Sequence, residues 1–185
     1  MERRDSVKES RGRSAEEREI ICPVCMHHCR LRPGQTGSCR ARANRGGGSS
    51  SLSYGRITSL ALDPIEKKPL AMFEPRSRIL SVGSYGCNLS CPFCQNYEIS
   101  MCAADAETVC LSPEELAGKA AELKEKGNIG VAFTYNEPMI GYEYVRDTAR
   151  IVRAAGMKNV VVTNGSVTEE ILEEVLPFVD AMNID

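Results

Sequence analysis

The sequence predicts an α/β fold built on a parallel sheet. From residue 78 onward, short apolar runs typical of buried strands alternate with helical segments. Consecutive parallel strands are joined by right-handed helical crossovers, so this order favours a sheet covered by helices. Only about four strands can be counted, whereas a complete (β/α) barrel has roughly eight. We therefore expect a partial (β/α) barrel, truncated after about four strands, with a small Cys-rich N-terminal module.

The expected strands are nearly continuous in apolar residues. This pattern is typical of strands whose two faces are both covered, as in a parallel sheet between layers. A strand that exposes one face to water would instead alternate apolar and polar residues. The strands are predicted at residues 78–83, 129–135, 159–165 and 179–185.

Capping residues mark the helices that separate these strands. In the first helix, Ser112 is the expected N-cap, Glu115 completes a capping box, and Gly127 occupies the C′ position. Thr168 is expected to cap the third helix. The helices are predicted at residues 112–127, 138–155 and 167–178.

The chain divides into three regions by composition. Residues 1–20 form a polar tail rich in charged residues, which we expect to be disordered or a frayed helix. Residues 21–75 form the Cys-rich module and a linker, for which the run GGGSSS at 46–51 is the signal. Two short strands are expected within residues 51–63. Residues 76–185 form the incomplete α/β core.

The loop DPIEKKPLAMFEP, residues 63–75, is interrupted by prolines. We expect its lysines, Lys67 and Lys68, to face solvent, as lysines in polar loops usually do. The alternative is that one of them binds an anionic group near the ends of the strands.

Composition excludes several classes of protein. The formal net charge of −2 at pH 7 favours neither a nucleic-acid surface nor a surface for acidic ligands. No hydrophobic signal segment begins the chain, and no apolar run approaches the roughly 20 residues of a membrane span. We therefore expect a cytoplasmic protein without a membrane segment. In that compartment, the nine cysteines favour metal binding over disulfides.

Cys87, Cys91 and Cys94 lie in the run GCNLSCPFCQN with the spacing C-x3-C-x2-C. Three thiolates this close can ligate three corners of one iron–sulfur cluster, whose irons are usually held by four. The fourth corner would then be open, and open metal positions are where chemistry occurs. A zinc site is the alternative, with Cys102 or Cys110 as the nearest fourth ligand.

Polar residues stand at the ends of the later strands. Asn136 and Glu137 follow the second strand, Asn164 follows the third, and Asp185 ends the fourth. Chemistry in barrels of this kind occurs at the carboxyl ends of the strands, where these residues would surround the cysteine run. A carboxylate there can bind an ammonium group, and an amide can bind a ribose hydroxyl. The structural alternatives are that Glu137 favours the start of a helix and that Gly165 permits a turn.

A second cysteine group has the spacing C-x2-C-x3-C-x9-C and suits a closed site of four soft ligands. Zinc or a second iron–sulfur cluster would fit, and a reduced arm without metal is the alternative. His27 and His28 lie inside the group, either as substitute ligands or as bystanders. The group consists of Cys22, Cys25, Cys29 and Cys39.

Two other functions remain open on these residues. One is a zinc-ribbon-type binding module without catalysis, whose arginine-rich loop contacts nucleic acid or a partner. The other is a thiol redox protein that uses Cys22 and Cys25. The metal content after anaerobic purification distinguishes them from an iron–sulfur protein.

Residues 78–185 resemble the radical S-adenosylmethionine (SAM) superfamily, on the strength of GCNLSCPFCQN after a strand and of NEP and TNG at later strand ends. The runs ICPVCMHHCRLRPGQTGSCRARAN, DPIEKKPL, CQNYEIS and TYNEP are similar to the radical SAM member of the AmmeMemoRadiSam system. That group is similar in turn to the pyruvate formate-lyase activating enzymes. The superfamily barrel usually has about six strands, so about two would be missing here.

The resemblance implies roles for individual residues. The three clustered cysteines would hold a 4Fe-4S cluster, whose unique iron takes the amino and carboxylate groups of SAM. Phe93 would pack near the adenine, and Asn164 would approach the ribose. The Asn136–Glu137 turn would meet the SAM ammonium, although Asn136 departs from the GGEP-like motif of the superfamily. Asp185 matches only the start of a polar motif.

The resemblance also implies a reaction. A reduced cluster passes one electron to the SAM sulfonium, which splits into methionine and a 5′-deoxyadenosyl radical, and the radical takes a hydrogen atom from a substrate. The cofactors supply this step, while the protein orients them and excludes water. The expected partners are SAM, an electron donor such as flavodoxin or ferredoxin, and a substrate that is either a protein or a small molecule.

Overall fold

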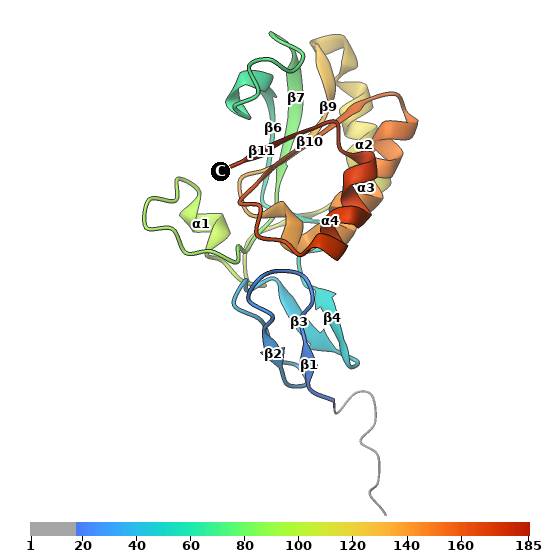
Figure 1. Cartoon of the computed structure of the whole chain (residues 1–185). Helices are drawn as coiled ribbons and strands as arrows, with labels where there is room; N and C mark the ends of the chain where they lie inside the picture. The colour runs from blue at the N-terminus through green and yellow to red at the C-terminus, as the bar shows by residue number, and fades with distance from the viewer. Residues whose placement is uncertain (1–17) are drawn as a thin grey trace, which may run out of the picture.

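A computed structural model describes residues 18–185, so the tail predicted at residues 1–20 lies outside the described residues as far as residue 17. The centre of the molecule is a five-stranded sheet in the order β11-β10-β9-β7-β6 (Figure 1). The strands are β6 (Ser59–Pro64), β7 (Arg78–Gly83), β9 (Asn128–Phe133), β10 (Lys158–Thr163) and β11 (Ala181–Ile184).

Four of these strands are parallel, which confirms the predicted parallel sheet. β7 pairs with β9, β9 with β10, and β10 with β11, all in parallel. β6 was not predicted as part of the sheet, but it pairs antiparallel with β7, with Asp63 opposite Ile79. Within residues 18–185 the sheet is open, with β6 and β11 as its edges.

Three helices cover one face of the sheet: α2 (Pro113–Glu122), α3 (Tyr142–Ala154) and α4 (Glu169–Val175) (Figure 1). Side chains alternate between the two faces of a strand, so every second residue of β7 and β9 points toward these helices. The buried core on this face includes Leu80, Val82, Val131, Phe133 and Val161 from the strands, and Leu116, Val145 and Val152 from the helices.

The predicted helix caps are confirmed in part. The Ser112 hydroxyl accepts from the Glu115 N–H at 3.2 Å, and the Ser112 N–H donates to the Glu115 carboxylate at 2.7 Å, which completes the capping box. Gly127 adopts the left-handed conformation expected at a C′ position, with φ of 84°. Thr168 is at the N-cap of α4, but its hydroxyl donates to the Pro23 carbonyl at 2.8 Å instead of capping the helix.

The helix predicted from residue 138 is divided in two. A 3-10 turn, η4 (Pro138–Gly141), comes first, and α3 begins only at Tyr142. The opposite face of the sheet is covered by the loop that follows β6, which includes the 3-10 turn η2 (Ile65–Lys67). Apolar residues of this loop and sheet form a second core cluster: Ile65, Leu70, Phe73, Ile79, Ala132 and Val160.

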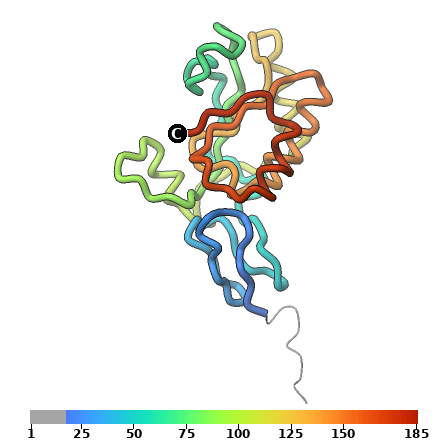
Figure 2. The backbone as a smooth tube through the Cα atoms, viewed as in Figure 1, coloured from blue at the N-terminus to red at the C-terminus, as the bar shows by residue number. Residues whose placement is uncertain are grey.

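The N-terminal hairpins are β1 (Ile20–Ile21) with β2 (Arg30–Leu31), and β3 (Arg42–Arg45) with β4 (Gly48–Ser51). The prediction of a flexible linker at residues 46–51 was therefore wrong, because residues 48–51 form β4 and Gly46 and Gly47 make the turn before it. Figure 2 shows these hairpins, coloured blue to cyan, beside the end of the sheet from which the loop after β7 leaves. A further short pair joins β5 (Arg56–Ile57) to β8 (Val109–Cys110).

Arg42 attaches the hairpins to the sheet and its helices. Its side chain is only 2% exposed and forms a bidentate ion pair with Glu143 of α3, at 2.8 and 2.7 Å. The same guanidinium donates to the Ile140 carbonyl and to Ser49. A bidentate pair fixes the relative orientation of its partners, so Arg42 holds β3 against α3. None of the helices within residues 18–185 is both long and apolar enough to cross a membrane.

Candidate functional site

The cysteine loop, residues 84–96, leaves the carboxyl end of β7 and runs into the short helix α1 (Tyr97–Ser100). Tyr85 is fully buried and donates to the Leu52 carbonyl at 2.7 Å, which fixes the entry to the loop. Gly86 has a φ of 85°, and a Cβ there would lie 2.5 Å from the Cys39 carbonyl oxygen. Only glycine fits this position, because both the backbone conformation and the close approach exclude a side chain.

The three thiols of the cysteine loop lie near one another. Burial raises the pKa of the Cys87 thiol, and the charges of Glu137, Cys91 and Cys94 raise it further, against a backbone hydrogen bond from Leu89 that lowers it. The Cys94 N–H donates to the Cys91 carbonyl at 3.1 Å, which closes the turn between them. Thiolates crowded in this way repel one another unless a metal binds them.

A single metal ion and an iron–sulfur cluster require different distances between their thiolate ligands. Among residues 18–185, no three His, Cys, Asp or Glu side chains are placed to bind a single metal ion. In a 4Fe-4S cluster each thiolate binds a different iron, so the sulfurs stand further apart than the ligands of one ion. As a donor set, three half-buried thiols on one loop therefore suit a cluster better than they suit one zinc ion.

Glu137 lies at the carboxyl end of β9 and is only 3% exposed. One carboxylate oxygen accepts from the Met139 N–H at 2.9 Å and from the Thr163 hydroxyl at 2.7 Å. The other accepts from the Asn164 N–H at 2.8 Å. Glu137 thus begins η4, as the structural alternative predicted, and it also joins the ends of β9 and β10.

Within the described residues, the charge of Glu137 has no cationic partner. Burial raises the pKa of its carboxyl group, and three hydrogen bonds from neutral donors oppose that shift only in part. None of the ion pairs among residues 18–185 involves this residue. A buried carboxylate without a counter-charge is costly, so this site favours a cationic ligand.

Two amide side chains connect the strand ends to the cysteine loop. Asn136 accepts from the Ser84 N–H at 3.0 Å and donates to the Gly86 carbonyl at 3.0 Å. Asn164 donates to the Asn88 side chain at 2.9 Å and lies 3.9 Å from the Cys87 sulfur. Both amides are occupied by contacts within the chain, and they hold the cysteine loop against β9 and β10.

Phe93 and Asp185 are placed differently from the other predicted residues. The Phe93 side chain is 85% exposed and projects from the cysteine loop. Asp185 is exposed beyond the end of β11, where its N–H donates to the Thr163 carbonyl at 3.0 Å. The structure therefore brings Glu137, Asn136 and Asn164 together around the cysteine loop, while these two residues stand apart.

An ionic network that the sequence did not predict lies on the face of the sheet away from the helices. Lys68, which was expected to face solvent, is 3% exposed and forms an ion pair with Asp63 at 2.9 Å. The Tyr135 hydroxyl donates to the same carboxylate at 2.7 Å, and Lys68 stands 4.8 Å from the centre of its ring. Lys67 remains largely exposed, 3.2 Å from Asp63.

Tyr135 has the left-handed backbone, with φ of 73°, directly before Asn136 and Glu137. This conformation is unfavourable for a bulky residue and persists only where contacts determine it. Burial would raise the pKa of Asp63, but hydrogen bonds from Tyr135 and Lys68 outweigh it and hold that pKa well below its usual range. The network therefore stabilises the turn that carries Glu137.

The N-terminal cysteines lie within and beside the hairpins. Burial raises the pKa of the Cys39 thiol, and the charges of Cys22 and Cys25 raise it further, so these three thiols are near one another. The Cys29 sulfur lies 3.1 Å from the Ser38 hydroxyl. All nine cysteines, which fall within the described part of the chain, are free thiols.

The segment that carries these cysteines contacts the cysteine loop directly. His27 donates from Nε2 to the Asn88 carbonyl at 2.7 Å, so that nitrogen is not free to bind a metal. Arg40 donates to the Cys87 carbonyl at 3.1 Å. The Met26 N–H donates to the Ser166 carbonyl at 3.1 Å. Sequence reasoning missed these contacts, which join positions 47 to 140 residues apart without a local pattern.

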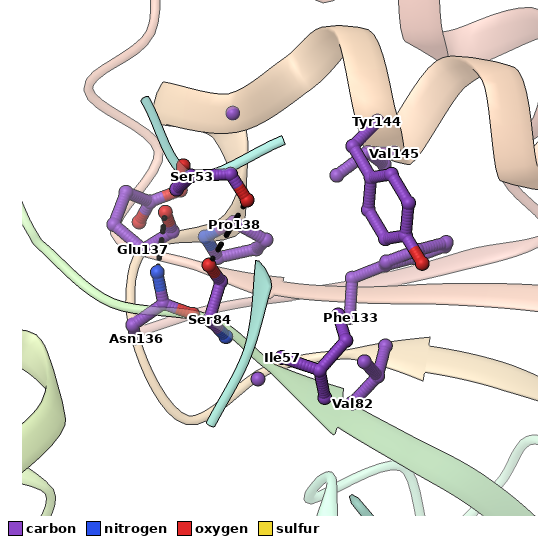
Figure 3. Close-up of a pocket in the computed structure, with 12 residues that line it drawn as sticks. Ser53, Ile57, Val82, Ser84, Phe133, Asn136, Glu137, Pro138, Tyr144 and Val145 are labelled. Atoms are coloured by element: carbon purple, nitrogen blue, oxygen red, sulfur yellow. Dashed lines mark hydrogen bonds between the residues drawn. The ribbon is translucent and has the colours of Figure 1, made fainter. Parts of the chain in front are cut away.

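A cavity lies between the sheet and α3, below the Asn136–Glu137 turn (Figure 3). Its volume is about 30 Å³, which is room for one water molecule but not for a cofactor. Figure 3 shows Ser84 and Glu137 on one side of it and Phe133, Tyr144 and Val145 on the other. The cavity is a packing gap of the core, and none of the three cysteines of the loop lines it.

Part of the chain is similar to a known protein family. The chain matches the family model of the Radical SAM superfamily over residues 81–185, the part that contains the cysteine loop and strands β9 to β11. It is 40% identical over 171 residues to the uncharacterized protein MJ0808 of Methanocaldococcus jannaschii. The matched region covers 92% of this chain and 50% of that protein, so the chain spans about half the length of this relative.

Proposed function

This chain belongs to the radical SAM superfamily, and on that premise we propose that it binds a 4Fe-4S cluster and SAM and initiates radical chemistry. Cys87, Cys91 and Cys94 would hold three irons of the cluster, and Glu137 would meet the ammonium group of SAM. When bound, the reduced cluster supplies one electron that splits SAM into methionine and a 5′-deoxyadenosyl radical, which takes a hydrogen atom from a substrate. The chain's own residues bind and orient these groups.

One observation carries the proposal. Three neighbouring thiols and a buried carboxylate without a cationic partner meet where the parallel strands end. The thiols are soft ligands for iron, and the carboxylate is a site for an ammonium ion. No general acid–base pair is needed for this chemistry, and the constellation does not contain one.

The remaining predicted residues take supporting roles in the proposal. Asn136 would hold the cysteine loop in place through the bonds it already makes to Ser84 and Gly86. Asn164 would approach the ribose from the same end of the sheet. Phe93 would move from its exposed position to pack on the adenine, and Asp185 would add a polar group near the nucleoside.

We assign the chain, within the superfamily, to the radical SAM enzymes of the AmmeMemoRadiSam system. The runs DPIEKKPL and TYNEP prompted this assignment, and their residues are in contact. Asp63 and Lys68 from the first run bind Tyr135 from the second. A shared network makes the two runs one structural unit, which supports treating them as a single signature.

The partners follow from the chemistry. The cluster needs a one-electron donor such as flavodoxin or ferredoxin, and the substrate would be either a protein or a small molecule that supplies the hydrogen atom. Free thiols and a reduced cluster suit a reducing compartment, so we place the protein in the cytoplasm.

A second candidate function concerns the N-terminal thiols. The nearness of Cys22, Cys25 and Cys39 supports a second metal site, completed by Cys29, that binds another cluster or zinc. Zinc would require these thiols to move closer together, because no three side chains among residues 18–185 are placed to bind one ion. Taken alone, this site would make the region a zinc-ribbon-type binding module without catalysis. Metal analysis of the wild-type protein and of Cys39→Ser distinguishes the two: zinc lost with Cys39 supports the second site, and iron chemistry kept in the same variant supports the first.

The test of the main proposal is anaerobic reconstitution with iron and sulfide. We expect about four irons and four sulfides per chain, and 5′-deoxyadenosine when dithionite and SAM are added. Cys94→Ala should abolish this product, because one cluster ligand is lost. The exposed thiol Cys110 provides the matched control, and Cys110→Ala should keep the product. Product formation by Cys94→Ala, or binding of zinc alone by the wild type, contradicts the proposal.

A further inference from the structure

We propose that Arg40, which comes from the Cys-rich N-terminal region, is a positioning residue for the cysteine loop and places a positive charge beside its cluster. This inference rests on the proposed function, because it concerns the cluster that Cys87, Cys91 and Cys94 would hold. It assigns a role to the N-terminal region that does not depend on metal binding by the cysteines of that region.

Arg40 joins the cysteine loop to the helix α1 that follows it. Its Nη2 atom donates to the Cys87 carbonyl at 3.1 Å, where the thiol-bearing stretch begins. The same atom donates to the Ser100 carbonyl at 3.2 Å, at the end of α1. The hydroxyl of Ser100 lies 3.2 Å from the Cys94 sulfur. One guanidinium group therefore fixes the separation of the segments that carry the first and last thiols.

The backbone holds Arg40 in place from both sides. The Arg40 N–H donates to the Gly37 carbonyl at 2.9 Å, which closes a turn before it. Two residues later, Arg42 is locked to Glu143 by its bidentate ion pair. The Cys39 carbonyl lies so close to Gly86 that only a glycine fits opposite it. The guanidinium therefore reaches the loop from a fixed support, as precise positioning requires.

Two features of Arg40 are unfavourable by themselves. Its backbone is left-handed, with φ of 66°, a conformation that non-glycine residues seldom adopt. Its Nε–H is buried and has no hydrogen-bond partner among residues 18–185. Strained residues and unpaired buried donors concentrate at functional sites. The sulfur atoms of an iron–sulfur cluster accept hydrogen bonds, so a cluster in this loop supplies the kind of acceptor that Nε lacks.

The charge of Arg40 has a predictable effect on the cluster. Reduction adds a negative charge, and a nearby cation stabilises the reduced form more than the oxidised form. The reduction potential of a cluster depends on such charges and on hydrogen bonds to its sulfurs. Removing the positive charge should therefore lower the midpoint potential, whereas a lysine should largely preserve the potential and lose the bridge between Cys87 and Ser100.

The experiment compares the reconstituted wild-type chain with Arg40→Gln, Arg40→Lys and the control Arg32→Gln. Arg32 lies in the same basic stretch and is exposed, so its replacement makes the same change in net charge away from the loop. Iron and sulfide per chain, the rate of iron loss to a chelator and the midpoint potential from an EPR-monitored titration are measured without SAM. Circular dichroism checks that each variant is folded.

We expect Arg40→Gln to lose iron roughly 10-fold faster than the wild type, the usual scale for loss of a residue that orients metal ligands. Its midpoint potential should also fall. Arg40→Lys should lose iron faster but keep the potential close to that of the wild type, and Arg32→Gln should match the wild type in both. A role that is only structural would change the rate of iron loss and leave the midpoint potential unchanged. An unchanged midpoint potential in Arg40→Gln therefore overturns the proposal.

The outcomes separate this inference from the proposed function. If the wild type takes up no iron and sulfide, the proposed function fails and this inference fails with it. If the wild type forms a cluster and Arg40→Gln equals Arg32→Gln in potential and iron loss, only the role of Arg40 is refuted. If Arg40→Gln does not fold, Arg40→Lys decides, because equal iron loss in Arg40→Lys and wild type refutes the bridge.

Discussion

Asp63 and Glu137 are both buried carboxylates, but their surroundings differ in charge. Asp63 has two lysines and a tyrosine hydroxyl around it, and its pKa is held well below the usual range. Glu137 has only neutral donors, and burial raises its pKa. Within residues 18–185, the chain supplies cations to the first carboxylate and none to the second. The comparison thus separates a carboxylate that the chain pairs with cations from one that, in our proposal, binds the ammonium group of SAM.

The largest effect on stability is expected at the Asp63 site. Lys68→Met should lower the free energy of unfolding by about 3 kcal/mol, because it removes the buried cationic partner of Asp63 and leaves only the exposed Lys67. The exposed Lys67 also contacts Asp63, and Lys67→Met should cost at most about 1 kcal/mol. Urea denaturation of the two variants measures the difference. Equal losses would show that Asp63 is not held by the buried lysine.

The next effect concerns ligand binding at Glu137. In the reconstituted protein, Glu137→Gln should weaken SAM binding by about 2 kcal/mol, roughly 30-fold in Kd, because a desolvated charge pair is lost. Equilibrium dialysis with labelled SAM measures this change. Glu170→Gln is the matched control, since that side chain is exposed on α4. An unaltered Kd in Glu137→Gln would remove the distinction between the two carboxylates.

The pH dependence of stability sharpens the comparison further. The pKa of Glu137 is higher in the folded chain than in the unfolded chain. The protonated carboxyl group therefore stabilises the fold fully at pH values below the unfolded pKa, and this stabilisation is lost as pH rises through the folded pKa. The pKa of Asp63 is lower in the folded chain than in the unfolded chain, so the pH dependence is reversed. The ionised Asp63 stabilises the fold at neutral pH, and this stabilisation is lost as pH falls below the unfolded pKa. Without SAM, the wild type should therefore lose stability relative to Glu137→Gln as pH rises from about 4 to 7, by at most about 1.4 kcal/mol per pH unit.

Thermal or urea unfolding of both proteins at several pH values tests this expectation. Only the difference between wild type and variant is informative, because Asp63 contributes equally to both. Parallel stability curves across that range would mean that the Glu137 carboxyl group has the same pKa in the folded and unfolded chain.

The smallest effect is expected from the hydroxyl of Tyr135. Tyr135→Phe removes one hydrogen bond to Asp63 and keeps the ring beside Lys68, so the loss of unfolding free energy should be about 1 kcal/mol. Tyr142→Phe serves as the control and should change stability by less than about 0.5 kcal/mol. If Tyr135→Phe is as stable as the control, the hydroxyl does not support the left-handed turn.

Local patterns were sufficient to predict the repeating part of the fold. The strands β7, β9, β10 and β11 appear as apolar runs, and Ser112, Glu115 and Gly127 mark the ends of one helix by short-range chemistry. These features depend on neighbours within about four residues, which is the range that periodicity and capping rules describe. The cysteine spacing and the strand-end residues Asn136, Glu137 and Asn164 also identified the candidate site without coordinates, whereas Asp185 stands apart from it.

Contacts between distant segments were not predictable in this way. The pairing of β6 with β7 and the burial of Lys68 depend on which loop covers the sheet. The left-handed Tyr135 follows from its bond to Asp63, 72 residues earlier. Nothing in the immediate sequence of these residues differs from that of an ordinary polar loop. The sequence therefore indicated which residues reach the site and not which residues hold them there.

The ion pair between Arg42 and Glu143 joins residues that are 101 positions apart. On the ribosome, the N-terminal hairpins are therefore synthesised long before the helix that receives them. During that interval Cys22, Cys25 and Cys39, which end up buried, are open to oxidants and to metals. Because of this order of synthesis, the three thiols need protection from oxidants and metals while the chain is still being made.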